Sequence, residues 1–289
     1  MKKVILDRTM FPKLKLISDG QNSLVFRYNN RILKIFNPDY VRISNMMGCD
    51  IEGKILLSEQ VEIPSNIIKP FEIVYDDMGN FLGYTMFEAN GINFNDYNDY
   101  LTEREQKNLF GFAQINKNLE DIIKSTPDIV YPDLCTCDNI FIDKKKRIQL
   151  IDYDGLQIND KRTENISTTL GDSDIYVHSK KYFRNGLFTK ELDIKSLIYL
   201  YFLYTFNMNL GKVGQYVPFS GEIITLDYFF KSINLDDDDI KQKVWYLFQE
   251  DYKNEYLGND VYKIAEKYTM ITKPHPYDKK ILFKSLVEK

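Results

Sequence analysis

The sequence is poor in the residues that build metal clusters and disulfide frameworks. It contains three cysteines and two histidines among 289 residues. Cys135 and Cys137 are separated by a single residue, which is not the ligand spacing of a zinc site. The two histidines stand alone, so neither a metal site nor a catalytic triad is indicated. We therefore expect no disulfide framework, and the sparse cysteine content fits a reducing compartment.

A strong net charge and a long apolar run are also missing. The 38 basic and 42 acidic residues give a formal charge of −4, which argues against a dedicated nucleic-acid-binding protein. The longest apolar run, at residues 197–206, is about half of the roughly 20 residues that span a bilayer. The first seven residues lack the apolar stretch of a signal peptide. We expect a cytoplasmic protein with no nucleic-acid partner and no membrane partner.

Apolar periodicity divides the chain into two parts. Short runs with strand character are separated by turn residues in the first 90 residues, with one helical stretch at Asp50–Glu59. From residue 95 onward the spacing is mostly helical. The predicted class is therefore α+β, with a small β-rich domain at residues 1–90 and a larger helical domain at residues 91–289. The predicted strands of the first domain are Leu14–Ile17, Leu24–Tyr28, Ile32–Phe36, Ile67–Val74 and Phe81–Phe87.

A lysine and a glycine stand out within the β-rich part. Lys34 lies inside an apolar strand, where a charged side chain is rarely placed without a partner. Glu52, on the predicted helix, is the partner that we expect for it. Gly20 lies in a polar turn between two strands, and such a turn can direct backbone N–H groups toward phosphates.

Three oxygen-bearing side chains mark the ends of short strands in the second part. Asp133 follows one apolar run, Asn139 opens the next, and Asp152 ends a strand 13 positions after Asn139. Adjacent strand ends would bring an amide oxygen and a carboxylate together. Mg²⁺ is usually held by one or two such groups together with phosphate oxygens. We therefore expect a site for Mg²⁺ and a nucleotide.

Together these motifs resemble the protein-kinase superfamily. The likeness covers residues 15–210 in order: Ile17–Phe26 resembles the glycine-rich loop, Ile32–Ile35 the strand of the ATP lysine, Tyr131–Asn139 the catalytic loop and Leu150–Gly155 the metal-binding segment. The resemblance implies a bilobal fold with the site in the cleft between its lobes. It also implies roles for individual residues: Asp133 as catalytic base, Lys34 as phosphate ligand held by Glu52, Asn139 and Asp152 as Mg²⁺ ligands, Gly20, Ser23 and Val25 beside the nucleotide, and the backbone of Phe87, Glu88 and Ala89 at the adenine.

The chain departs from the family pattern in its catalytic loop. Tyr131 and Pro132 replace the usual histidine and arginine, and Cys135 stands where a lysine is usual. The loop is one residue longer than in the family pattern, so Asp138 is an alternative to Asp133 as base. Asp154, in place of a glycine, adds a second carboxylate near the metal or caps the loop.

The resemblance implies an ATP- and Mg²⁺-dependent phosphotransferase of the serine/threonine protein-kinase type. A protein hydroxyl is the favoured acceptor, because residues 152–179 resemble a short activation segment with free threonine and serine side chains. Two alternatives remain open: a small-molecule kinase of the sugar or antibiotic type, and a pseudokinase that binds nucleotide as a scaffold without transfer.

Overall fold

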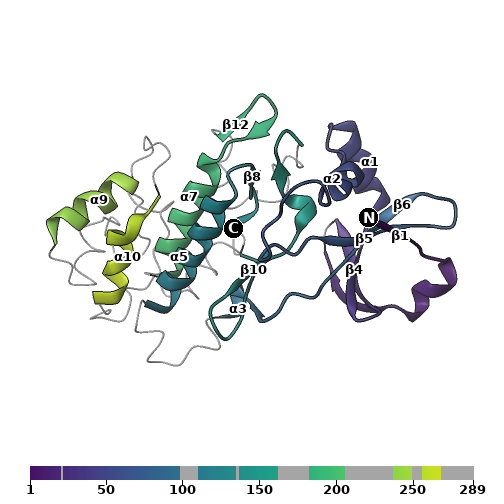
Figure 1. Cartoon of the computed structure of the whole chain (residues 1–289), viewed down its shortest axis with the longest axis horizontal. Helices are drawn as coiled ribbons and strands as arrows, with labels where there is room; N and C mark the ends of the chain where they lie inside the picture. Colours follow the sequence, from purple (N-terminus) through teal and green to yellow (C-terminus); the bar gives the residue numbers. More distant parts are fainter. Residues whose placement is uncertain are drawn as a thin grey trace, which may run out of the picture.

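The computed structural model describes residues 1–20, 22–97, 110–134, 137–161, 182–205, 237–248 and 256–267. The structure is mixed α and β, in agreement with the predicted α+β class. A six-stranded sheet lies at one end of the long axis, and helices α9 and α10 lie at the other (Figure 1). Within these residues, no helix is long and apolar enough to cross a membrane.

The large sheet has the strand order β1-β5-β6-β4-β3-β2. Strand β1 pairs in parallel with β5, and every other pair is antiparallel. Strands β2 to β6 fall close to the five predicted strands, whereas β1 was not predicted. The bounds are β1 Lys2–Ile5, β2 Lys15–Asp19, β3 Ser23–Tyr28, β4 Arg31–Phe36, β5 Pro70–Tyr75 and β6 Phe81–Met86.

A tight turn at Asn29 and Asn30 sets the register around Lys34. Both residues have positive φ, at 45° and 61°, which asparagine tolerates better than most residues. The turn joins β3 to β4 and places Val25 opposite Lys34. On its other side, Lys34 is opposite Tyr84 of β6, so the two side chains lie on the same face of the sheet.

Two helices follow β4: α1 at Pro38–Met46, which was not predicted, and α2 at Ile51–Leu57. Asp50 caps α2, because its side chain accepts a hydrogen bond from the backbone N–H of Gly53 at 2.8 Å. The buried residues of α2 are Ile51, Lys54 and Ile55, at the i, i+3, i+4 spacing of one helix face. That face carries a lysine into the protein interior.

The remaining elements are shorter strands and the helices of the second part. The strands form a three-stranded sheet of order β10-β9-β7 and the pairs β11-β8 and β12-β13. Their bounds are β7 Ile92–Asn93, β8 Ile129–Val130, β9 Ile140–Ile142, β10 Ile148–Leu150, β11 Gln157–Ile158, β12 Phe183–Arg184 and β13 Leu187–Phe188. The helices are α3 Phe94–Tyr97, α5 Phe110–Ser125, α7 Glu191–Leu200, α9 Asp238–Phe248 and α10 Gly258–Lys267, with 3-10 turns at Arg8–Lys13 and Tyr153–Gly155 and a π turn at Tyr201–Thr205.

Separate apolar cores support the two parts of the chain. One core packs α2 against β4, β5 and β6, and a larger one gathers α5, α7 and the short strands β8 to β10. Backbone hydrogen bonds join the parts: the N–H of Ile68 donates to Leu150, and the N–H of Leu150 donates to Asn66, each at 2.8 Å. These bonds fix β10, and the residues that follow it, beside the large sheet. The domain boundary between residues 90 and 91 stays a prediction.

Candidate active site

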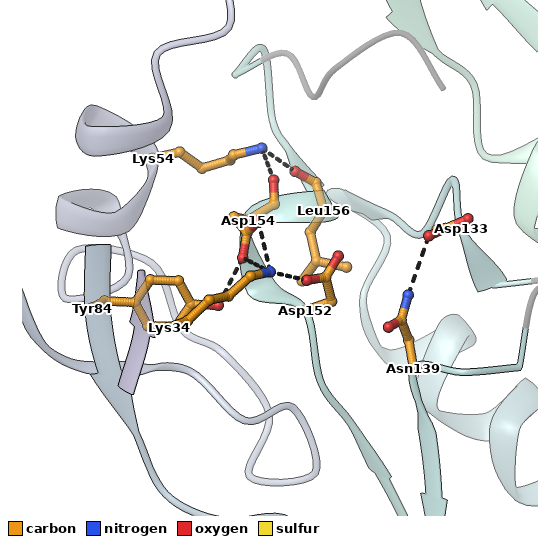
Figure 2. Close-up of polar contacts among 8 residues, drawn as sticks. All are labelled: Lys34, Lys54, Tyr84, Asp133, Asn139, Asp152, Asp154 and Leu156. Carbon is orange, nitrogen blue, oxygen red and sulfur yellow. Dashed lines mark hydrogen bonds and ion pairs between the residues drawn. The ribbon is translucent and has the colours of Figure 1, made fainter. Parts of the chain in front are cut away.

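The ammonium group of Lys34 is buried between two carboxylates. Lys34 Nζ hydrogen-bonds to Asp152 and lies 2.8 and 3.0 Å from the two carboxylate oxygens of Asp154 (Figure 2). The hydroxyl of Tyr84 donates to the same Asp154 carboxylate at 2.7 Å. Lys34 and Tyr84 are paired across β4 and β6, so the sheet register brings both to one acceptor.

The two carboxylates come from a sharp turn directly after β10. Asp152 has left-handed backbone angles (φ 67°, ψ 52°), and the 3-10 turn Tyr153–Gly155 follows it. A Cβ atom at Gly155 would stand 2.6 Å from an Asp152 carboxylate oxygen, so the glycine makes room for that side chain. The sequence Asp-Tyr-Asp-Gly thus directs two acidic side chains toward one lysine.

Lys54, on α2, hydrogen-bonds to the backbone of this turn. Its ammonium group donates to the backbone carbonyl of Asp154, and to that of Leu156 at 3.0 Å (Figure 2). Only 1% of Lys54 is exposed. A buried lysine is stable only where it has partners, and two carbonyl groups supply them here. Helix α2 is therefore connected to the turn by a charge-assisted bond to main-chain atoms.

The charged groups in this cluster shift one another's pKa values. Burial alone would lower the pKa of Lys34, but the two carboxylates outweigh burial and raise its pKa above the ordinary value. Burial would raise the pKa of Asp154, yet Lys34 and the Tyr84 hydroxyl hold its pKa below the ordinary value. Burial and the neighbouring Asp154 raise the pKa of Asp152. The ion pair between Lys34 and Asp154 is thus the stable charged unit of the site.

Asp133 and Asn139 form a second polar pair nearby. The side-chain amide of Asn139 donates to the Asp133 carboxylate at 3.3 Å (Figure 2). Burial and the negative charge of Asp152 raise the pKa of Asp133 to about 6. A carboxylate with this pKa remains ionised at neutral pH and is a stronger base than an exposed aspartate.

Asp193 holds the start of the loop that carries Asp133. Its carboxylate accepts a hydrogen bond from the backbone N–H of Tyr131 at 2.8 Å and pairs with Lys190 at 2.8 Å. The loop positions Cys135 and Thr136 lie outside the described residues.

A cleft that is partly open to solvent lies between Asp152 and the pair of Asp133 and Asn139. Asp133, Asn139 and Asp152 all line it. Asp138, the alternative base, is exposed and is not among the lining residues. The cleft is lined by Tyr131, Asp133, Leu134, Asn139, Leu150, Ile151, Asp152, Gly155 and Leu156.

No protein-family model and no curated protein sequence matches this chain. In the described ranges, no group of three or more His, Cys, Asp or Glu side chains is arranged to hold a metal ion. The cleft offers the carboxylates of Asp133 and Asp152 and the side-chain amide of Asn139 as oxygen ligands.

The other predicted nucleotide contacts lie around the large sheet. Gly20 and Ser23 close the turn between β2 and β3, where the N–H of Gly20 donates to the carbonyl of Ser23 at 2.9 Å. Val25 and Ala89 are partly buried against the sheet core, as is the cleft residue Ile151. These three apolar side chains pack against the core of the large sheet, and the nucleotide roles of Val25 and Ala89 stay predictions.

The connection after β6 carries the remaining predicted contacts. The ring of Phe87 is half exposed and lies 5.1 Å from that of Phe71, centroid to centroid. Glu88 forms an exposed ion pair with Arg27 at 2.6 Å. The nucleotide roles of Phe87, Glu88 and Ala89 stay predictions.

The predicted ion pair between Lys34 and Glu52 is not formed in the described structure. Glu52 instead accepts a hydrogen bond from the hydroxyl of Tyr75 at 2.7 Å. The reason is the rotation of α2: Ile51, Lys54 and Ile55 occupy its buried face, and Glu52 lies on another side of the helix. Lys34 pairs with two carboxylates, that of Asp152 and that of Asp154.

Three residues of the site were missed or assigned differently from the sequence. Lys54 could have been found, because it stands at i+3 from Ile51 and next to Ile55 on an apolar helix face. Asp154 was expected beside the metal or as a cap, and the structure places it against Lys34. Tyr84 carries no sequence signal, since its role depends on the pairing of β6 with β4.

Proposed function

We propose that the chain is a bilobal, protein-kinase-like phosphotransferase that uses ATP and Mg²⁺ to phosphorylate a hydroxyl group, with serine or threonine of a protein as the favoured acceptor. The observation that carries the proposal is that Asp133, Asn139 and Asp152 line one cleft and that Lys34 hydrogen-bonds to Asp152. These residues come from three separate segments, in the chain order that the kinase resemblance requires.

The residues present fit a magnesium nucleotide. The amide nitrogen of Asn139 is directed to Asp133, which leaves its amide oxygen as a metal ligand. The Asp152 side chain is 27% exposed, so one carboxylate oxygen can reach a cation in the cleft. One carboxylate, one amide oxygen and phosphate oxygens are a suitable ligand set for Mg²⁺. The bound group supplies the phosphoryl unit and the positive charge that offsets its oxygens.

The chain's own residues account for the other requirements of phosphoryl transfer, which depends mainly on positioning and charge compensation. Lys34 holds the α- and β-phosphates. Asp133 accepts the proton of the attacking hydroxyl, and its raised pKa suits that role. Val25, Ala89 and Ile151 offer an apolar surface to the base.

A transfer assay tests this proposal. The wild-type protein is incubated with labelled ATP, Mg²⁺ and either casein or a panel of sugars and aminoglycosides, and labelled product is measured. Asp133→Asn should lower kcat by roughly 10²–10⁴-fold, the usual contribution of a positioned base. The rise in Tm caused by Mg²⁺ and ATP should persist in the variant, since Asp133 acts on the acceptor.

Asp138→Asn is the matched comparison, because it makes the same change five residues away at an exposed position. It should retain transfer, and a loss confined to this variant would reassign the base. A rise in Tm without transfer to any acceptor would favour a nucleotide-binding scaffold. Transfer to the small molecules alone would favour a small-molecule kinase. No rise in Tm would overturn the nucleotide site itself.

A further inference from the structure

The Asp154 carboxylate is already occupied by donors from within the protein. Its carboxylate accepts hydrogen bonds from Lys34 and from the Tyr84 hydroxyl, and its side chain is only 4% exposed. A carboxylate that is buried and occupied by an ammonium group and a phenol has little capacity left for a cation in the cleft. Asp154 also does not line the cleft.

Asp152 differs from Asp154 in exposure and place. It also bonds to Lys34, but its side chain is 27% exposed and borders the cleft. One carboxylate of the Asp-Tyr-Asp-Gly turn thus faces the interior, and the other faces the space where a ligand would bind. In this arrangement Asp154 can anchor Lys34, while Asp152 can contact a ligand in the cleft.

A second layer of contacts fixes Asp154 itself. Tyr84 is fully buried and reaches Asp154 from the strand paired with that of Lys34. Lys54 holds the backbone carbonyl of the same residue from α2. Asp154 is therefore held at its side chain and at its main chain, from two different elements (Figure 2).

Glu52 has a different partner. Its carboxylate accepts the Tyr75 hydroxyl at 2.7 Å, at the end of β5. Bringing Glu52 to Lys34 would require α2 to rotate about its axis, which would remove Lys54 from the carbonyl groups of Asp154 and Leu156. The observed contacts of α2 thus oppose such a rotation.

We infer that Asp154 is the positioning residue that holds Lys34 in place for phosphate binding, in the role that the kinase resemblance gives to Glu52; the inference rests on the function proposed above. Asp152 then remains available to the metal. Tyr84 and Lys54 support Asp154 and act on Lys34 only through it.

The first test measures Lys34 without any nucleotide. Short treatment with an amine-reactive ester, followed by mass spectrometry of the Lys34 peptide, reports how accessible the ammonium group is. Asp154→Asn should raise the labelling of Lys34 by about 5-fold or more, since the ammonium group loses a charge-assisted hydrogen bond. Glu52→Gln should change it by less than about 2-fold, and Asp143→Asn, in an exposed turn, serves as the matched control.

The second test measures nucleotide binding and turnover in the same variants. The MgADP-induced rise in Tm should weaken in Asp154→Asn, and the KM for ATP should rise by about 10-fold or more with a smaller change in kcat. A purely structural role would lower the Tm of the ligand-free protein and leave KM unchanged. Glu52→Gln should leave the KM for ATP within about 2-fold of the wild-type value.

The outcomes separate this inference from the proposed function. Absence of any MgADP effect on the wild-type protein overturns the proposed function, whatever the labelling shows. Equal labelling of Lys34 in the wild-type protein and Asp154→Asn overturns the inference, as does a KM effect found in Glu52→Gln alone. If Asp154→Asn does not fold, Tyr84→Phe decides, because it removes one donor from Asp154. Unchanged labelling and unchanged MgADP binding in that variant would then overturn the inference.

Discussion

The two sides of the cleft are stabilised in opposite ways. On one side, Lys34 and Lys54 offset the negative charges of Asp152 and Asp154, so two positive and two negative charges share one cluster. On the other side, Asp133 accepts a long hydrogen bond from Asn139, and burial raises the pKa of Asp133 to about 6.

The two sides differ in whether the protein itself supplies a counter-charge to the buried charged group. Lys34 finds its counter-charge within the protein, and its contacts come from β4, β6 and the turn after β10. Asp133 faces the cleft, and its ionised form is disfavoured by burial and by the charge of Asp152. Residues that chemistry requires are often kept at such a cost to stability. The comparison predicts opposite effects on stability when each side is neutralised.

Removal of Lys34 should give the largest effect. Lys34→Met leaves the carboxylates of Asp152 and Asp154 without their buried cation, and breaking a buried pair in this way costs about 3–5 kcal/mol. Urea unfolding at pH 7 measures the loss. Arg147→Met removes a cation from the exposed pair with Asp143 and should cost less than about 1 kcal/mol. Equal losses in the two variants would contradict the internal compensation at Lys34.

Removal of Lys54 should have a smaller effect of the same sign. Lys54→Met leaves the buried carbonyl groups of Asp154 and Leu156 without this donor, at a cost of about 1–3 kcal/mol in the free energy of unfolding. Lys69→Met, at an exposed position, is the comparison and should be nearly neutral. If Lys54→Met leaves the free energy of unfolding unchanged, α2 is held in place by its apolar contacts alone.

Neutralising Asp133 should change stability in the opposite direction. Because the folded-state pKa of Asp133 is raised from 3.8 to about 6, the folded protein binds this proton more tightly than the unfolded chain does. Wild-type stability should therefore fall as the pH rises from about 4 to about 6, and Asp133→Asn should lack that fall. Above pH 6 the variant should be more stable by up to about 3 kcal/mol, as measured by urea unfolding across this pH range. A less stable variant at pH 7 would contradict the comparison.

The smallest effect on stability is expected at Glu72, which does not line the cleft. Burial would raise its pKa, but hydrogen bonds from Lys2, Arg31 and Thr85 lower it below the ordinary 4.5. Its contribution is present above pH 4.5 and is lost as the pH falls through its folded-state pKa. Glu72→Gln should therefore be less stable than wild type at pH 7, by about 1 kcal/mol or less, and the gap should close toward pH 3. A gap that does not change with pH would mean that the loss is one of packing.

Local patterns predicted the parts of the fold that depend on neighbours in the chain. The strand around Lys34 and the turn at Asn29 and Asn30 follow from apolar alternation and turn chemistry. The parallel strand β1 was not predicted, because its partner β5 lies about 70 residues away and no short-range pattern specifies that pairing.

At the site, residue types were easier to predict than partners. Asp133, Asn139 and Asp152 meet at the cleft as their order indicated. The partner of Lys34 depends on how α2 is rotated and on how the turn after Asp152 folds, and neither is contained in the spacing of the motifs. Glu52 was therefore assigned to a pair that the structure gives to Asp154.

The bonds from Lys54 to main-chain carbonyl groups have a consequence for the divergence of sequences. A carbonyl oxygen is the same for nearly every residue type, so a substitution at position 156 that still packs in the core can keep the bond to Lys54. The pair of Lys34 and Asp154 requires both side chains, so a change at one position calls for a compensating change at the other. In a set of related sequences, positions 34 and 154 should therefore vary together, whereas positions 54 and 156 should vary independently.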